Sequence, residues 1–264
     1  MMINFRRNIR LFTLFSGYSL RTTFQARFGI ILFMLGKIMR FIFFCFLIVL
    51  IFTKTSLVKG YNLNQALVFY FTFNIVDTAA QVLFREVYRF RYQVVSGSFD
   101  LVLLKPHHPF LRILVGGVDF LDLILLFPYI GLAVFFAFQT SQITFLSFAF
   151  YLFLLINSFL IATAFHIVIL ALAILTTEVD HTILIYRDMT LLGRFPLDIY
   201  KEPIRGIFTF IIPIGIMMSF PPKALFHTLS LPLGIFSILV SSVLLFLSLS
   251  LWNFALKKYQ SWGG

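Results

Sequence analysis

The sequence has few acidic residues and almost no cysteine. Among its 264 residues there are 10 Asp and Glu against 21 Lys and Arg, and the first carboxylate along the chain belongs to Asp77. The one cysteine, Cys45, stands inside an apolar run, which excludes a disulfide framework and a cysteine metal cluster. Nucleic-acid binding is also disfavoured, because the basic residues stand beside apolar runs instead of covering a polar face.

Motifs of catalysis are missing as well. The sequence contains no G-x-x-x-x-G-K-[ST], no H-E-x-x-H and no G-x-S-x-G. Gly36-Lys37 lacks the upstream glycine and the hydroxyl residue of a phosphate-binding loop, so this chain cannot hold ATP in that way. His107-His108 stands beside a proline without a third metal ligand near it in the sequence. We therefore expect no catalytic residue, no metal and no cofactor in this chain.

What the sequence does have is apolar residues, including 37 phenylalanines. It is 60% hydrophobic with a mean hydropathy of +0.98, more apolar surface than a soluble domain could bury. This composition predicts an all-α polytopic membrane protein. The apolar runs predict six transmembrane helices, at about 37–55, 63–84, 113–138, 143–175, 204–220 and 231–254. The fourth run is longer than an upright span needs and too short for two spans, so we expect one tilted helix there.

Basic residues predict the orientation of these spans. With six spans, the two termini and the segments 85–112 and 187–205 share one side, which collects nearly all of the lysines and arginines outside the spans. The other side has only Lys54, Lys59 and Lys223. Because basic loops stay in the cytoplasm, this asymmetry predicts a cell (inner) membrane protein with both termini cytoplasmic.

The N-terminal arm, residues 1–36, is basic and contains no acid. On a helix over residues 21–40, Arg27, Lys37 and Arg40 lie roughly opposite an apolar face formed by Phe24, Phe28, Ile31, Leu32, Leu35 and Met39. This pattern is typical of an amphipathic helix lying in the interface of an anionic leaflet, with membrane lipids as its partner. An arginine-rich, acid-poor start is also typical of an organellar transit peptide.

Several polar residues fall inside the predicted spans. Spacings of three and four place Asn74, Asp77, Thr78, Gln81 and Arg85 on one helical face, which either lines a translocation path or bonds to a neighbouring helix. We expect Asp119 and Asp122 to form salt bridges with the basic arm or Arg112, and His166 to be a packing residue. The serines of the last span, Ser237, Ser241, Ser242, Ser248 and Ser250, are expected at close-packing positions.

Prolines interrupt the fifth predicted span. Pro213 should kink it, and Pro221-Pro222 should end it early. A short re-entrant or interfacial piece, 222–230, would then follow.

The stretch 94–109, V-V-S-G-S-F-D-L-V-L-L-K-P-H-H-P, has the signals of a separate short helix. Gly97 breaks the preceding element, Ser98 is expected to cap the new one, Asp100 favours its first turn, and Lys105-Pro106 ends it. A helix of about two turns is unstable alone, and this one is apolar on nearly every side: Phe99, Leu101, Val102, Leu103 and Leu104. It is buried either against the chain's own helix ends and lipid headgroups or in the groove of a partner.

Two blocks of the sequence resemble a known family. Residues 96–109, S-G-S-F-D-L-V-L-L-K-P-H-H-P, are similar to a signature of the membrane subunits of type-2 ATP-binding-cassette (ABC) exporters, in the branch whose substrates are mostly undefined. The second block is similar to the sequence that leads into the fifth helix of that branch, and its matching residues are Phe195, Pro196, Ile199, Tyr200, Arg205 and Pro213. His107-His108 departs from the family, which tends to have a small or aliphatic pair there.

The resemblance implies a half-transporter that pairs with a second permease, identical or a sister chain. It also implies a separate cytoplasmic ATPase subunit that holds ATP and Mg. The coupling helix that meets this ATPase would lie between spans 2 and 3 and comprise Gly97, Ser98, Phe99, Asp100, Leu101, Leu103, Leu104, Lys105 and Pro106. The translocation path would lie at the dimer interface, where Asn74, Asp77 and Gln81 are compatible with lining it.

Two other functions remain open at this stage. An ion-coupled secondary transporter or channel would use intramembrane ionisable groups, here Asp77, Asp119, Asp122 and His166. A structural membrane scaffold would need no nucleotide-binding partner at all.

Overall fold

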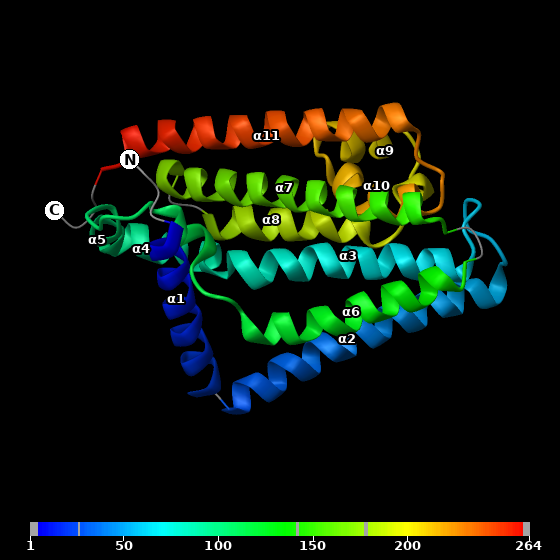
Figure 1. Ribbon diagram of the computed structural model, residues 1–264, viewed down its shortest axis with the longest axis horizontal. Helices are drawn as coiled ribbons and strands as arrows, with labels where there is room; N and C mark the ends of the chain where they lie inside the picture. Colours follow the sequence, from blue (N-terminus) through cyan, green and yellow to red (C-terminus); the bar gives the residue numbers. More distant parts are fainter. Residues whose placement is uncertain (1–4, 26, 141–142, 177–178, 261–264) are drawn as a thin grey trace.

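The computed structural model describes residues 5–25, 27–140, 143–176 and 179–260, and these form a helical bundle (Figure 1). Five helices are long and apolar enough to cross a membrane: α2 (Arg27–Lys54), α3 (Leu63–Phe84), α6 (Phe120–Phe138), α7 (Phe145–Thr176) and α11 (Leu231–Lys258). The described residues contain no named strand. The prediction of an all-α, multi-pass membrane protein is therefore confirmed.

The chain starts with two helices that differ from the predicted boundaries. Helix α1 (Phe5–Gln25) lies across one end of the bundle, and α2 leaves its far end to run along the bundle (Figure 1). The sequence analysis started the first span at Lys37, whereas α2 already starts at Arg27. The amphipathic helix expected over 21–40 is thus divided between two elements. A charged residue within the span misled the prediction, because Lys37 has a buried anionic partner, described below.

The core lies between α3 and α7, with further buried residues from the segment 214–224. A capping box starts α3, in which the Asn62 side chain accepts from the Gln65 amide and the Gln65 side chain accepts from the Asn62 amide. Most of α3 is buried between its neighbours, including its polar residues Asn74, Thr78 and Gln81. Helix α7 is one unbroken helix, as predicted for the fourth apolar run.

Helix α11 packs along α7 through small and polar residues. Asn157 of α7 donates to the Ser237 hydroxyl, and the Ser241 hydroxyl donates to the Asn157 side chain. Ser248 is also buried, whereas Ser242 and Ser250 are exposed. The close-packing prediction is therefore confirmed for three serines and wrong for two.

The region predicted as the fifth span has a different course. Helix α8 (Val179–Leu191) first runs back along the bundle beside α7 (Figure 1). After the 3-10 turns η3 (Leu192–Arg194) and η4 (Leu197–Ile199), two short helical pieces, 204–211 and 215–225, meet at an angle of 85°. Pro213 stands at this bend, as predicted.

The second of these pieces brings the chain back to the end of the bundle from which the first piece started. It comprises η6 (Gly215–Ser219) and α10 (Phe220–Leu225), and Lys223 of α10 forms an ion pair with Asp198, at 2.7 Å, from just before the first piece. The pair of pieces therefore enters and leaves at the same end of the bundle. Pro221 and Pro222 do not end the helix, because they occupy the first turn of α10, where a missing amide proton is tolerated.

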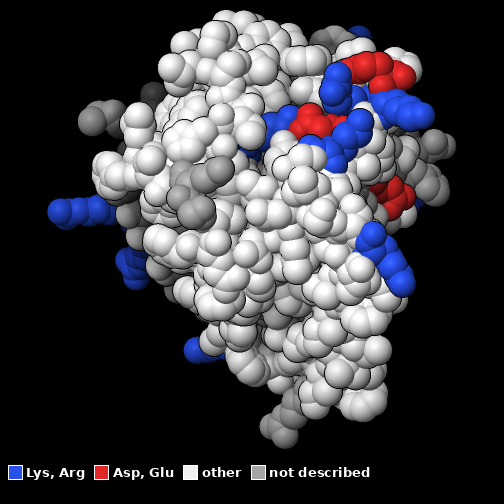
Figure 2. Space-filling view, turned by 90° about the vertical axis from the view of Figure 1, so that its right-hand side faces the viewer, with Lys and Arg blue, Asp and Glu red and all other residues white. Residues whose placement is uncertain are grey.

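The two ends of the bundle have different contents. One, here called the α5 end, holds α4 (Phe90–Val95), α5 (Ser98–Leu103), the start of α1 and the end of α11 (Figure 1). The other, here called the Tyr61 end, holds the loop 55–62 and the residues around Asp198, and Figure 2 looks onto it. Uncharged side chains cover most of that face; acidic side chains and several basic ones gather at its upper right, and other basic side chains stand at its left edge. Residues 187–205 were predicted to lie on the same side as 85–112, and this is wrong for residues 194–203, since α8 carries the chain to the Tyr61 end.

Candidate functional site: the α5 end

Helix α5 forms where the sequence analysis placed a short helix. Gly97 precedes it with φ +70°, a left-handed conformation that favours glycine. Asp100 lies in the first turn. Ser98 does not cap the helix as predicted, because its hydroxyl donates back to the carbonyl of Gln93. The turn before the helix, rather than its own first residue, thus fixes how α5 starts.

One side of α5 is anchored to the rest of the chain. Phe99 is fully buried, with its ring 5.0 Å from that of Phe90 and 6.4 Å from that of Trp252 near the end of α11. Val102 is buried on the same side. Phe110, after the helix, packs against the same Trp252 with its ring tilted and the ring centres 4.9 Å apart. An aromatic cluster therefore joins α4, α5 and α11 and supplies the stability that a six-residue helix lacks by itself.

Two hydrogen bonds tie α5 and the turn after it to distant parts of the chain. The Tyr259 hydroxyl donates to the Asp100 carboxylate at 2.8 Å. Burial, reinforced by this carboxylate, raises the pKa of Tyr259 to about 12, so the phenol keeps the proton it donates throughout neutral pH. Arg7 of α1 donates to the carbonyl of Pro106 at 2.6 Å.

The other side of α5 carries apolar residues that nothing covers within the part of the chain that the structure describes. Leu101 is 62% exposed and Leu104, directly after the helix, is 82% exposed, with Leu103 less so. Lys105 and Pro106 next to them are also exposed. The coupling residues predicted from the sequence thus separate into an anchoring side, Phe99, and an outward side, Leu101 and Leu104.

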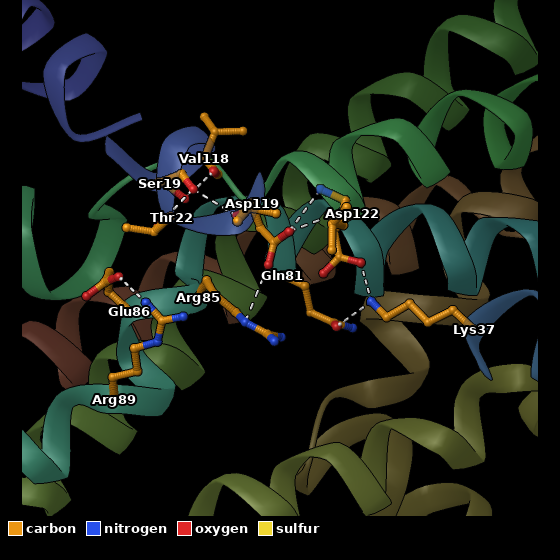
Figure 3. A network of polar contacts seen from close by, with 12 residues as sticks. Ser19, Thr22, Lys37, Gln81, Arg85, Glu86, Arg89, Val118, Asp119 and Asp122 are labelled. Atoms are coloured by element: carbon orange, nitrogen blue, oxygen red, sulfur yellow. Dashed lines mark hydrogen bonds and ion pairs between the residues drawn. The ribbon is translucent and has the colours of Figure 1, made fainter. Parts of the chain in front are cut away.

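A polar network lies beside this end, inside the bundle (Figure 3). The Asp77 carboxylate of α3 accepts from the Gln81 amide, whose oxygen accepts from Lys37 of α2. Lys37 in turn forms an ion pair with Asp122 of α6. Three helices are thus joined by one chain of charge-assisted bonds. Gln81 and Asp77 contact α2 and α6 through it. The expected ion pair between Asp122 and a basic residue of the N-terminal region is confirmed, with Lys37, directly after residues 1–36, as the partner.

Further ion pairs continue the network towards α1. Asp119 caps α6, with its side chain accepting from the Leu121 and Asp122 amides, and pairs with Arg85 at 3.4 Å. Glu86 pairs with Arg89 and Arg112. Within the described residues, Asp119 therefore forms an ion pair with neither the N-terminal arm nor Arg112, contrary to the prediction.

Two other predicted intramembrane residues have local partners. The Asn74 side chain donates to the carbonyl of Tyr70, one turn earlier in α3. His166 is buried, with Nδ1 2.7 Å from the Ala162 carbonyl oxygen and its ring against Phe84 and Tyr186. This environment supports the packing role predicted for the histidine.

The second sequence block lies far from α5, at the Tyr61 end. Asp198 accepts a hydrogen bond from the Tyr61 hydroxyl at 3.0 Å and pairs with Lys223. Burial, together with the charge of Asp198, raises the pKa of Tyr61. Phe195, Pro196 and Ile199 line an apolar cavity of about 180 Å³ with residues of α2, α3 and the loop between them.

The other residues of the block make contacts within their own segment. The Tyr200 hydroxyl donates to the Leu192 carbonyl, and Arg205 pairs with Glu202 at 2.7 Å. The hydrogen bonds that Glu202 accepts from Arg205 and from the Gly206 amide lower the pKa of this carboxyl. The structure thus separates the two sequence blocks to opposite ends of the bundle.

His107 and His108 form a local turn. Nδ1 of His108 accepts from the Phe110 amide at 3.3 Å, and burial beside His107 lowers the pKa of His108. Within the described residues, no group of three or more His, Cys, Asp or Glu side chains is arranged to hold a metal ion.

Sequence reasoning missed the residues that hold α5 in place. Trp252 and Tyr259 stand at the end of the last helix, and their distance in sequence from Phe99 gives no sign of contact. It also missed Arg194, whose guanidinium lies 4.1 Å from the centre of the Phe44 ring within the bundle. The sequence offered one signal for these residues, which is that a tryptophan and a basic residue are rare at such positions.

A family model described as "ABC-2 family transporter protein" matches residues 30–263. No curated protein matches the chain.

Proposed function

Because the chain belongs to the ABC-2 family of transporter proteins, we propose that it is the membrane subunit of an ABC exporter that docks a separate cytoplasmic ATPase through α5. The α5 end would then face the cytoplasm, with both chain termini on that side. ATP and Mg would be bound by the partner. A second permease, a copy or a sister chain, would complete the transporter.

The two-sided character of α5 is the observation that supports this proposal best. Phe99 and Val102 hold the helix on the bundle, while Leu101 and Leu104 project from it. Leucines exposed at the end of a bundle, outside the hydrocarbon, are unfavourable in water unless a partner covers them. A helix that is held on one side and apolar on the other can transmit a push from such a partner to the helices behind it.

The route of that push follows the contacts of α5. Movement of α5 would reach α11 through Phe99 and Trp252, and through Asp100 and Tyr259. It would reach α3 through α4 and the turn η1 (Arg85–Arg89), which follow α3 without a break. Closure of the ATPase would thus change the positions of two membrane helices, as alternating access requires.

For the translocation path, we propose the polar stripe on α3. Asp77 and Gln81 are joined to Lys37 in this conformation, so α2 would have to move aside before they line a path. Replacement Asp77→Asn should then change transport or substrate-stimulated ATP hydrolysis while assembly stays intact. Unchanged kinetics would leave Asp77 with a structural role only.

An ion-coupled transporter or channel is not favoured. Its ion sites would be the intramembrane carboxylates, but Asp119 caps a helix and pairs with Arg85, and Asp122 pairs with Lys37. His166 is packed among aromatic rings. These groups are used in holding the helices together.

The docking role is tested by affinity purification in mild detergent, with mass spectrometry and an ATP-hydrolysis assay on what is retained. The wild-type chain should retain a P-loop ATPase, and Leu101→Asp with Leu104→Asp should release it. Leu57→Asp is the matched control, since Leu57 is also exposed but lies in the loop at the Tyr61 end. Retention of the ATPase by the α5 variant, or its equal loss from the control, would refute docking through α5.

A further inference from the structure

A cavity of about 400 Å³ lies at the α5 end, between α1, the start of α2 and the junction of α3 with α6. It is within the size range of small-ligand sites, about 300–1,000 Å³. The residues that line it are Thr22, Thr23, Gly29, Ile30, Phe33, Arg85, Arg89, Asp119 and Leu121. Neither the docking of an ATPase nor the proposed path uses this cavity.

The charge at the cavity is positive, with two arginines against one carboxylate. The Asp119 carboxylate is already engaged, by the α6 amides and by Nε of Arg85. Figure 3 shows the rest of the Arg85 guanidinium pointing away from Asp119, and within the described residues its two terminal amino groups make no hydrogen bond. Arg89 is two-thirds exposed and engages Glu86 through one nitrogen. Free guanidinium donors in this arrangement match the oxygens of a phosphate group.

The walls of the cavity point to a lipid as the source of that phosphate. Helix α1 lies across the end of the bundle, and α2 leaves this corner to run along it (Figure 1). Next to the α2 residues that line the cavity, Phe28, Ile31 and Leu32 are largely exposed. An anionic headgroup would thus lie beside a bare apolar helix on which acyl chains can pack, at the level where basic residues meet a negatively charged leaflet.

We propose that this cavity binds the headgroup of an anionic phospholipid, with its phosphate against Arg85 and Arg89 and its acyl chains along α2. The lipid would bridge the corner between α1 and α2 and hold α1 across the end of the bundle. This site rests on the assignment to a membrane and on the α5 end facing an anionic leaflet. It does not require that the chain couples to an ATPase.

The test is lipid binding to the full-length protein, purified with its partners in mild detergent and examined by native mass spectrometry with phosphatidylglycerol or phosphatidylcholine. We expect phosphatidylglycerol to bind more tightly by about fivefold or more, the effect of roughly one cationic side chain at an anionic leaflet. Arg85→Gln with Arg89→Gln should weaken this binding by about 25-fold and abolish the preference. If the double variant fails to fold, Arg89→Gln alone serves instead, because it alters an exposed side chain. It should weaken phosphatidylglycerol binding about fivefold.

Two variants separate a defined site from general attraction to basic surface. Thr22→Phe fills the cavity without changing any charge and should reduce binding, whereas Arg21→Gln removes a neighbouring exposed charge of α1 that does not line the cavity and should have no effect. Inorganic phosphate at millimolar concentration should not displace the lipid, because it lacks the acyl chains.

Three results would overturn the proposal. These are equal binding of the two lipids, unchanged binding in the arginine variants, and an Arg21→Gln effect as large as theirs. Displacement by inorganic phosphate would instead assign the site to a free anion. Measuring the retained ATPase in the same samples keeps the two proposals apart, because Leu101→Asp with Leu104→Asp should lose the ATPase and keep the lipid.

Discussion

Removing the Phe99 side chain should release α5 from the bundle without unfolding the protein. Phe99 is fully buried against Phe90, Trp252 and Tyr259, and Phe→Ala at such a site costs about 3–5 kcal/mol. Since α5 has only six residues and cannot persist alone, this loss falls on the local equilibrium between a docked and a released helix. At about 1.4 kcal/mol per tenfold, Phe99→Ala should raise the released population by roughly a hundredfold or more.

Hydrogen exchange measured by mass spectrometry reports this equilibrium. Amides of residues 98–104 should exchange roughly a hundredfold faster in Phe99→Ala, while those of α3 keep their protection. Leu104→Ala is the control, because Leu104 is 82% exposed and its truncation leaves no cavity. Tyr259→Phe, which removes the hydrogen bond to Asp100, should give an intermediate increase of about tenfold. Unchanged exchange in Phe99→Ala, or an equal increase in Leu104→Ala, would refute the anchoring role.

Other contacts give further predictions. Asp122→Asn breaks the buried ion pair with Lys37 and should destabilise the protein by about 3–5 kcal/mol, as measured by thermal unfolding in detergent. Combining it with Lys37→Met should recover most of this loss, since no unpaired charge remains. Asp198→Ala should lower the melting temperature by leaving Lys223 unpaired at the Tyr61 end; no change in melting would count against the ion pair as a support for α10. Gly117→Ala would place a methyl group 2.6 Å from the Phe15 carbonyl oxygen, which should push α1 away from the bundle. The yield of chemical cross-links between α1 and the bundle should then fall, and an unaltered yield would contradict this packing.

Apolar runs predicted most of the bundle, because their composition indicates which segments are buried or face lipid and their length indicates how long each helix is. The single long helix α7 followed from the length of the fourth apolar run, which is too short for two spans and a turn. The bend at Pro213 followed from the geometry of proline. The position of α5 followed from Gly97 and Asp100, whose preferences are local. In each case the signal lies within one continuous stretch of the sequence.

Failures occurred where a distant partner decides. Lys37 marked the start of a span in the sequence because an unpaired lysine is unfavourable in hydrocarbon, yet Asp122, far along the chain, neutralises it. Helix α8 was missed because Arg187 and Asp188 make it look like a loop. The sides of α5 could not be told apart either, since all of its apolar residues are equivalent until Trp252 selects Phe99.

The contact between Phe99 and Trp252 also constrains the order of events during biosynthesis. The residues of α5 emerge from the ribosome long before Trp252 and Tyr259, which form part of the surface that holds them. Until then the short helix has too little support to persist. We therefore expect a nascent chain that lacks these residues to present α5 less stably to another protein than the full bundle does.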